Sequence, residues 1–373
     1  MERPTLATNT PGLESICAHV KETGVAALDT EFVSRGNYRQ KLCLVQVAAD
    51  GASPAAIDCF QGFDSAPFAR VMEDASVVKI LHDSTTDLVL LRWWTGVAAR
   101  NVFDTQLAAA FAGFRAGIGL GQLLEGALGV GLAKTETLTD WTQRPLTPAQ
   151  IEYALDDVRH LPALRVVLLS KAEEFGTLEW MMEDMAALEA AQDSGDAAPQ
   201  DAWRRIRCIP PDMSRRALAR LRALAAVRER KAREWDMARS WLADDRSLVE
   251  IAEAWTPGAG RCRFRNRLRN EGERELLAAA FLAAMEETED LGEDMLPEPV
   301  AFHYAADVVE AAGKAEIFLR ELAGIIHVDA AAIAGRSTLR AFIDNPDDAS
   351  NPLASGWRHE VAGSAILELY GIA

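Results

Sequence analysis

The sequence predicts an α/β domain with a mixed β-sheet flanked by helices over residues 1–200, followed by an all-helical region. Short apolar runs alternate with helical stretches in the first 115 residues, a pattern typical of α/β folds. After residue 202 apolar residues recur with a helical period, and no segment alternates as a strand does. The length of 373 residues favours two or three domains over a single core.

Five strands are expected in the first domain, at 25–32, 42–48, 55–59, 77–81 and 102–103. Turn residues around Gly36 and Gly51 separate the first three, which should therefore form an antiparallel meander. The later connections are long enough to be helical. A longer helix is predicted to begin with Thr147 as N-cap and Gln150 completing a capping box, and to run to about residue 175, where Gly176 ends it.

The composition is that of a soluble protein of the cytoplasm. Hydrophobic residues make up 49% of the chain, but no stretch approaches the roughly 18 apolar residues of a membrane span. The first residues lack the basic start and apolar core of a signal peptide. The cysteines are odd in number and form no close pair, which argues against a disulfide framework or a zinc site. They are Cys17, Cys43, Cys59, Cys208 and Cys262.

Acidic side chains recur where local structure would direct them to a common point. Asp29 and Glu31 are i and i+2 at the end of an apolar strand, so they project from one face. Tyr153 and Asp157 are i and i+4 on the long helix and also share a face. Together with Asp87, these carboxylates would repel one another unless divalent cations neutralise them. That is the requirement of a two-metal phosphoryl-transfer site.

Each of these residues also has a structural interpretation. Acids commonly end a strand where it meets solvent, and Ser84 to Asp87 is a capping-box pattern that suits a helix over 88–94. Tyr153 could be a core residue with its hydroxyl at the edge. His82, between a strand and a helix, is by default a structural histidine.

Taken together, three segments resemble the exonuclease motifs of the DEDD superfamily: residues 28–32, 81–88 and 153–158. Residues 139–147 narrow the resemblance to the ribonuclease D family of bacterial 3′→5′ exoribonucleases. The resemblance implies an RNase H-like exonuclease domain at 1–200, a helical HRDC domain at 203–288 and a second HRDC-like domain at 295–373. Position 153 is tyrosine and position 152 is glutamate, which places the chain on the tyrosine branch.

The resemblance also implies roles for individual residues. Asp29 would bridge two metal ions, Glu31 and Asp157 would hold the ion on the nucleophile side, and Asp87 would help hold the ion facing the leaving 3′ oxygen. Tyr153 would orient the attacking water. Mg²⁺ or Mn²⁺ suits such oxygen ligands better than zinc. The product would be a nucleoside 5′-monophosphate.

The expected partner is RNA, in the form of tRNA precursors and other structured RNAs with single-stranded 3′ tails. Thr30 and His82, inside the first two motifs, are expected to contact this substrate. The net charge of −17 opposes nucleic-acid binding. However, eleven Arg or Lys residues lie between 204 and 233, and five arginines between 261 and 269. Arg265 and Arg267 are therefore expected to contact phosphates, although a solvated helix face is the alternative.

Two other functions compete with RNA trimming. The same chemistry could act on single-stranded DNA, because recognition of the 2′-hydroxyl needs only one or two contacts. Alternatively, the chain could be a catalytically silent RNA-binding protein on the same scaffold, although all four acids and the tyrosine are present. By analogy with the family, we expect a monomer.

Overall fold

The computed structural model describes residues 5–132, 139–192, 198–258, 260, 262–298 and 304–370, and the chain divides into two compact units. The first comprises Met1–Val33, Leu42–Asp193 and Tyr304–Ala373, and the second comprises Ser34–Lys41 and Ser194–His303. Among the described residues, no helix is long and apolar enough to cross a membrane. Residues 192–200, whose Ser, Gly, Asp, Ala and Pro content predicts a linker, lie largely outside the described residues.

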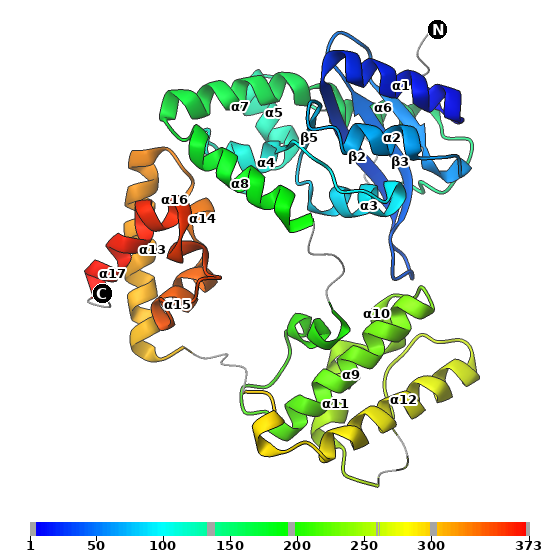
Figure 1. Cartoon of the computed structure of the whole chain (residues 1–373), viewed down its shortest axis with the longest axis vertical. Helices are drawn as coiled ribbons and strands as arrows, with labels where there is room; N and C mark the ends of the chain where they lie inside the picture. The colour runs from blue at the N-terminus through cyan, green and yellow to red at the C-terminus, as the bar shows by residue number, and fades with distance from the viewer. Residues whose placement is uncertain are drawn as a thin grey trace. The chain divides into compact units, whose positions relative to one another are not determined.

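A six-stranded mixed sheet forms the centre of the first unit, with strand order β1-β4-β3-β2-β5-β6 (Figure 1). β3 pairs antiparallel with β4, whereas β1 is parallel to β4, β2 to β5, and β5 to β6. Parallel neighbours such as β2 and β5 end at the same edge of the sheet, where they bring together residues far apart in the chain. The strands are β1 (Leu6–Ala7), β2 (Val25–Val33), β3 (Lys41–Ala48), β4 (Ala55–Asp58), β5 (Val78–Leu81) and β6 (Val102–Asp104).

Helices cover both faces of this sheet. Ala26 and Leu28 of β2 pack into a core with residues of α1, α2 and α3, whereas Ala27 packs into another with residues of α7. This split follows from the alternation of side chains along a strand. The helices and turns of this part are α1 (Thr10–Thr23), η1 (Cys59–Gln61), α2 (Ala66–Met72), α3 (Thr85–Thr95), α4 (Thr105–Ala109), α5 (Leu120–Leu128), α6 (Pro148–Arg159), α7 (Leu161–Phe175) and α8 (Leu178–Ala191).

The five predicted strands are confirmed to within two residues at each end, and β2, β3 and β4 are neighbours as the predicted meander requires. The edge strand β1 was not predicted, because its two residues carry no period. The predicted long helix is wrong in one respect: the chain breaks at His160 into α6 and α7. Pro162 in the first turn of α7 cannot donate the backbone hydrogen bond that a continuous helix needs.

The capping predictions had opposite outcomes. At α6, Thr147 Oγ1 accepts from the Gln150 amide at 3.2 Å and Gln150 Oε1 accepts from the Thr147 amide at 2.8 Å, which confirms the capping box. At α3, Ser84 makes no side-chain cap, so the capping-box interpretation of Ser84 and Asp87 is wrong. Gly176 ends α7 in the left-handed conformation at φ 71°, as predicted.

Residues 304–370 are helical and pack onto α4, α7 and α8 within the first unit. Trp357 stacks on Trp180 with ring centroids 5.5 Å apart, and Arg358 forms an ion pair with Asp184 at 2.6 Å. The elements are α13 (Ala306–Ile326), α14 (Ala330–Ile333), α15 (Arg336–Asp344), η5 (Pro352–Ala354), α16 (Gly356–Arg358), the π-helical η6 (His359–Gly363) and α17 (Ser364–Tyr370).

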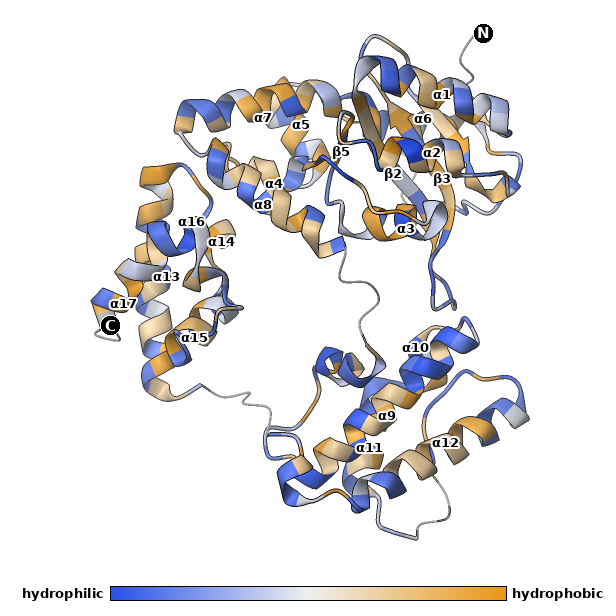
Figure 2. Cartoon of the chain, in the orientation of Figure 1, coloured by the Kyte–Doolittle hydropathy of each residue, from blue (hydrophilic) through white to orange (hydrophobic). Residues whose placement is uncertain are grey.

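The second unit is also helical, and no strand occurs in its described residues beyond Lys41 of β3. Hydrophilic and hydrophobic residues alternate along α9 (Figure 2), and the apolar ones pack against α11 and α12. The loop between β2 and β3 belongs to this unit, where the Tyr38 hydroxyl donates to Glu229 at 2.6 Å. The elements are η3 (Pro199–Arg205), α9 (Arg215–Glu234), α10 (Arg239–Leu242), α11 (Asp245–Ala254), α12 (Glu271–Glu289) and η4 (Glu293–Met295).

Candidate active site

Three of the predicted acids lie together where α6 packs against the end of β2. One ligand oxygen from each of Asp29, Glu31 and Asp157 lies within 4.8 Å of the others. Asp29 and Glu31 follow Ala27 at intervals of two, so they project from the α6–α7 face of the sheet. Asp157, two residues before the end of α6, meets them there.

This arrangement opposes ionisation of all three acids. Burial raises the pKa of Asp29 well above its usual range, and the charges of Asp87, Asp157 and Glu31 raise it further. Burial and the same kind of repulsion raise the pKa of Glu31 to about 8. The pKa of Asp157 is raised to about 6 by burial and by Asp156. Like charges in a poorly solvated place disfavour the ionised form, so the cluster needs protons or a cation.

Asp87 lies just outside that group. It is buried in the first turn of α3, and its Oδ1 accepts a hydrogen bond from the hydroxyl of Thr30. Thr30 projects from the opposite face of β2 to Asp29, because neighbouring residues of a strand alternate. Burial raises the pKa of Asp87 to about 6, against the lowering effect of the Thr30 bond. The structure therefore brings the fourth acid to the cluster from the other side of the sheet.

The turn that precedes Asp87 is held by Asp104, a residue that the sequence analysis did not select. Its carboxylate accepts from the amides of Asp83 at 3.2 Å and Ser84 at 2.8 Å, and from the amide of Gln106 at 2.8 Å. Asp104 thus caps α4 and also fixes the β5–α3 turn. Asp104, like Asp29, directly follows an apolar run in the sequence, and this pattern could have identified it as a candidate.

Tyr153 lies one turn before Asp157 on α6, and its ring lies 6.4 Å from that of Trp141. Burial raises the pKa of Tyr153 to about 12, and the charges of Asp157, Glu31 and Asp29 contribute to the shift. The hydroxyl therefore keeps its proton at neutral pH. It can donate a hydrogen bond near the acids but cannot act as a base there unaided.

The segment that carries Trp141 is anchored by Arg144 and Asp58, a pair that the sequence analysis also missed. Arg144 Nε donates to Asp58 Oδ2 at 2.7 Å and Nη2 donates to Oδ1 at 2.6 Å. Nη1 donates to the Trp141 carbonyl at 2.8 Å. Asp58 is only 1% exposed, and no local pattern relates it to Arg144.

The donor set fits a hard divalent cation. Asp29, Glu31 and Asp157 offer only carboxylate oxygens, which Mg²⁺ and Mn²⁺ prefer, and no His or Cys joins them among the described residues. Their raised pKa values give a physical reason for a cation to be favourable there. Asp87 is near enough to act on the pKa values of Asp29 and Glu31.

His82 is held in a structural hydrogen bond. Its Nδ1 lies 2.9 Å from Thr105 Oγ1, and that hydroxyl already donates to the Leu81 carbonyl at 3.0 Å. Because the hydroxyl proton is used, Nδ1 must be the donor in this pair. Burial lowers the pKa of His82, so the ring is neutral at pH 7.

Arg265 and Arg267 belong to the second unit, whereas the acids belong to the first. Arg265 Nε forms an ion pair with Asp244 at 2.9 Å, and the Arg267 guanidinium lies 6.0 Å from the Trp241 ring. At least seven of the eleven cations of the basic stretch are also ion-paired within this unit. The basic stretch is therefore largely neutralised by its neighbours.

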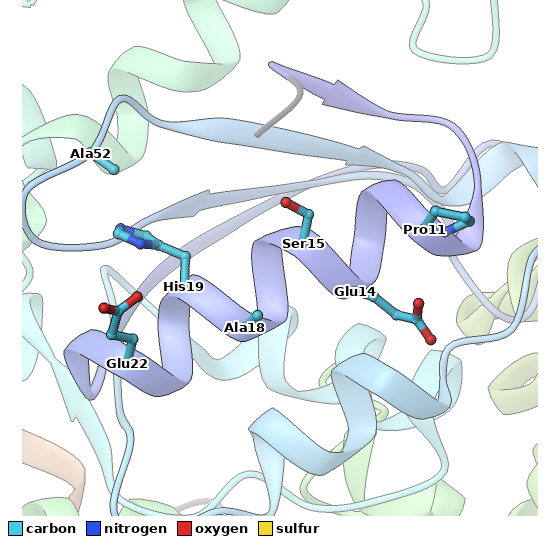
Figure 3. A pocket seen from close by; sticks show the side chains of 7 residues that line it. All are labelled: Pro11, Glu14, Ser15, Ala18, His19, Glu22 and Ala52. Carbon is cyan, nitrogen blue, oxygen red and sulfur yellow. The ribbon is translucent and has the colours of Figure 1, made fainter. Parts of the chain in front are cut away.

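A hollow of about 450 Å³ lies beside α1 (Figure 3). His19 and Glu22 lie at one end of it and Glu14 toward the other. It contains none of the predicted functional residues.

Comparisons with known proteins agree with the fold. A family model described as 3′-5′ exonuclease matches residues 4–173. Ribonuclease D of Acidiphilium cryptum is 31% identical over 373 residues, covering 99% of this chain and 93% of that protein. Ribonuclease D of Desulfotalea psychrophila is 34% identical over 252 residues, covering 68% of this chain and 67% of that protein.

Among solved structures, Escherichia coli RNase D, described as an exoribonuclease involved in structured RNA processing, superposes with a TM-score of 0.86. It is 29% identical, and the match covers 100% of this chain and 99% of that one. The similarity runs from the acid-bearing sheet through both helical regions. The chain therefore belongs to the ribonuclease D family of 3′→5′ exoribonucleases.

Proposed function

We propose that this chain is a metal-dependent exonuclease that trims the 3′ ends of tRNA precursors and other structured small RNAs, releasing nucleoside 5′-monophosphates. The cluster of Asp29, Glu31 and Asp157 carries the proposal, since three partly buried carboxylates within 4.8 Å of one another repel unless protons or a cation neutralise them, and a divalent cation does so while they stay ionised. Family membership supplies the direction of cleavage and the class of polymer.

Two divalent ions, Mg²⁺ or Mn²⁺, are proposed to be held by Asp29, Glu31, Asp87 and Asp157. When bound, they supply activation of water and neutralisation of charge on the phosphate. Tyr153 donates its hydroxyl hydrogen bond to orient the reactants, since it keeps its proton. Thr30 holds Asp87 in place through its hydrogen bond.

The remaining substrate contacts are proposed at several places. His82 and Thr30 are proposed to line the path of the 3′ nucleotide. Arg265 and Arg267 are proposed to meet phosphates farther along the RNA, where a phosphate would compete with Asp244 for Arg265. The chain is proposed to act as a monomer in the cytoplasm.

The domain organisation is part of the same proposal. We divide the chain into an exonuclease domain at 1–200, an HRDC domain at 203–288 and a second HRDC-like domain at 295–373. Packing of α13 to α17 onto α4, α7 and α8 supports a fixed place for the third region beside the first.

A time course on a 5′-labelled RNA hairpin with a single-stranded 3′ tail tests this function. Mg²⁺, Mn²⁺ and EDTA are compared for the wild type, Asp157→Asn and the matched control Asp156→Asn, whose carboxylate pairs with Arg159 at 2.8 Å. We expect a ladder shortening from the 3′ end, abolished by EDTA and by Asp157→Asn only. Full-length label with a retarded native-gel band in every lane would instead indicate an RNA-binding protein. Faster cleavage of a DNA oligomer of the same sequence would assign DNA as the substrate.

A further inference from the structure

A second hollow in the first unit, of about 430 Å³, lies where the turn after α4 meets the end of α13. Arg115 and Phe114 line it from the turn, and Arg320 and His327 line it from α13. Nothing in the catalytic site uses these residues. Two segments about 200 residues apart in the chain build this hollow.

Its two arginines are not held in ion pairs by the residues that the structure describes. Arg115 and Arg320 are exposed, and neither forms an ion pair within the described part of the chain. Glu316, one turn earlier on the same helix as Arg320, holds Arg336 through both oxygens, at 2.6 and 2.9 Å. The lining acid, Asp329, accepts from the Ala331 amide at 2.9 Å as the N-cap of α14. The hollow therefore presents net positive charge in an acidic protein.

Aromatic rings lie beside these cations. His327 is exposed and stacks on Phe175 with ring centroids 4.4 Å apart and an interplanar angle of 21°. Lys171 Nζ lies 5.7 Å from the centre of the Phe114 ring and 5.9 Å from that of Phe175. Proteins bind single-stranded nucleic acid with this combination: the cations contact the phosphates, and the aromatic rings stack on the bases.

The geometry of the hollow is fixed by the backbone. The Asp329 amide donates to the Ala110 carbonyl at 2.9 Å, which ties the α13–α14 turn to the end of α4. Gly113 has φ +80°, and a Cβ there would lie 3.1 Å from the Phe175 ring. His327 itself adopts φ 56° at the end of α13. The rings and arginines therefore project from a tightly packed part of the backbone, where the two turns meet.

Other charged surfaces of the chain are less suited to phosphate. The hollow beside α1 is lined by Glu14 and Glu22, which would repel it (Figure 3). Most cations of α9 are already paired with acids of their own unit, as described above. Arg115 and Arg320 form no ion pair among the described residues, so counterion release on phosphate binding is available to them.

We propose that this hollow is an RNA-binding subsite, in which Arg115 and Arg320 contact backbone phosphates and a base stacks on His327. The inference rests on the proposed function and adds a second anchoring point for the same substrate. α7 connects the acid cluster with the hollow. It begins after α6, which carries Asp157, and its 15 residues span about 22 Å to its last residue, Phe175. The subsite would therefore hold nucleotides remote from the scissile 3′ end.

Binding of a labelled RNA, long enough to extend well beyond α7, tests the subsite. Affinity is measured by fluorescence anisotropy in EDTA across a salt series, so that no cleavage occurs. For the double variant Arg115→Gln/Arg320→Gln we expect binding weaker by on the order of tenfold at 0.15 M salt, and a log–log salt slope shallower by about 1.4. The matched control Arg70→Gln, an exposed arginine of α2, should bind as the wild type does. The lysine double variant should largely restore affinity.

Hydrolysis of a dinucleotide with Mn²⁺ separates the subsite from the proposed function. A dinucleotide cannot reach the hollow, so the glutamine double variant should cleave it at the wild-type rate while cleaving long RNA with a raised KM. Equal affinity and equal salt slope for the variant and the wild type would overturn the subsite. A wild type that cleaves neither substrate would overturn the proposed function alone, because the anisotropy result does not depend on catalysis.

Discussion

The guanidinium of Arg144 and the carboxylate of Asp58 form two parallel hydrogen bonds, which tie the segment before α6 to the end of β4. Burial alone would raise the pKa of Asp58, but the bonds from Arg144 and Gln61 outweigh it and lower that pKa. The same guanidinium holds the carbonyl of Trp141, whose ring lies beside Tyr153. The Arg144–Asp58 pair therefore supports Tyr153 indirectly, through Trp141.

Arg144→Lys should lower kcat by roughly tenfold and leave metal binding intact. A lysine cannot reproduce the two-pronged contact with a carboxylate, so Trp141 and Tyr153 lose their fixed positions. The free energy of unfolding should fall by about 1–3 kcal/mol, because Asp58 stays buried with poorer partners. Urea unfolding and dinucleotide kinetics measure both effects. Arg159→Lys, in a half-buried pair on α6, should change little, and an equal loss there would contradict this role.

Tyr153→Phe should lower kcat on the order of a hundredfold at neutral pH, since it removes a positioned hydroxyl. KM and the affinity for Mn²⁺ should be unchanged, because the phenol is not a preferred ligand while it keeps its proton. Steady-state kinetics with a dinucleotide, alongside Mn²⁺ titration, measures this split. Tyr304→Phe is the matched control. A loss of metal affinity in Tyr153→Phe would contradict the assigned role.

Asp29→Asn should raise the melting temperature of the metal-free protein at pH 8 and abolish its stabilisation by Mn²⁺. Burial and neighbouring charges raise the pKa of Asp29, so the metal-free fold loses stability as pH rises above the ordinary range of an aspartate. The amide removes that effect and also removes a proposed metal ligand. For the wild type, Mn²⁺ at a hundred times its Kd should add about 2.7 kcal/mol. Thermal melts with Mn²⁺ and EDTA test this, with Asp156→Asn as control. An unchanged Mn²⁺ response in Asp29→Asn would place the metal elsewhere.

Local chemistry explains what the sequence could predict. The i, i+2 spacing of Asp29 and Glu31 and the i, i+4 spacing of Tyr153 and Asp157 each predict a shared face, and the structure places both pairs so. The capping box at Thr147 involves residues three apart and was equally predictable. In each case the geometry follows from one element alone.

Contacts across long stretches of chain were not predictable in this way. Thr30 and Asp87 are 57 residues apart, and Asp58 and Arg144 are 86 apart. Both pairs depend on which strands and helices become neighbours, which no local period encodes. The capping pattern at Ser84 failed for the same reason: tertiary contacts with Thr30 and Asp104 took the groups that a local cap would have used.

Glu229→Gln should destabilise the second unit in a pH-dependent way. Burial alone would raise the pKa of Glu229, but hydrogen bonds from Arg239, Tyr38 and Arg233 outweigh it and lower the pKa to about 2. Because the folded pKa lies below the ordinary value of 4.5, this stabilisation is complete above pH 4.5 and disappears as pH falls toward 2. The stabilisation at pH 7 amounts to about 3 kcal/mol.

Hydrogen exchange along α9 at pH 7 and pH 3 should therefore show a large effect of Glu229→Gln at pH 7 and a smaller one at pH 3. Glu234→Gln, at an exposed position on the same helix, should have little effect at either pH. An effect of Glu229→Gln that is equal at both pH values would show that the carboxylate's charge is not what stabilises this unit.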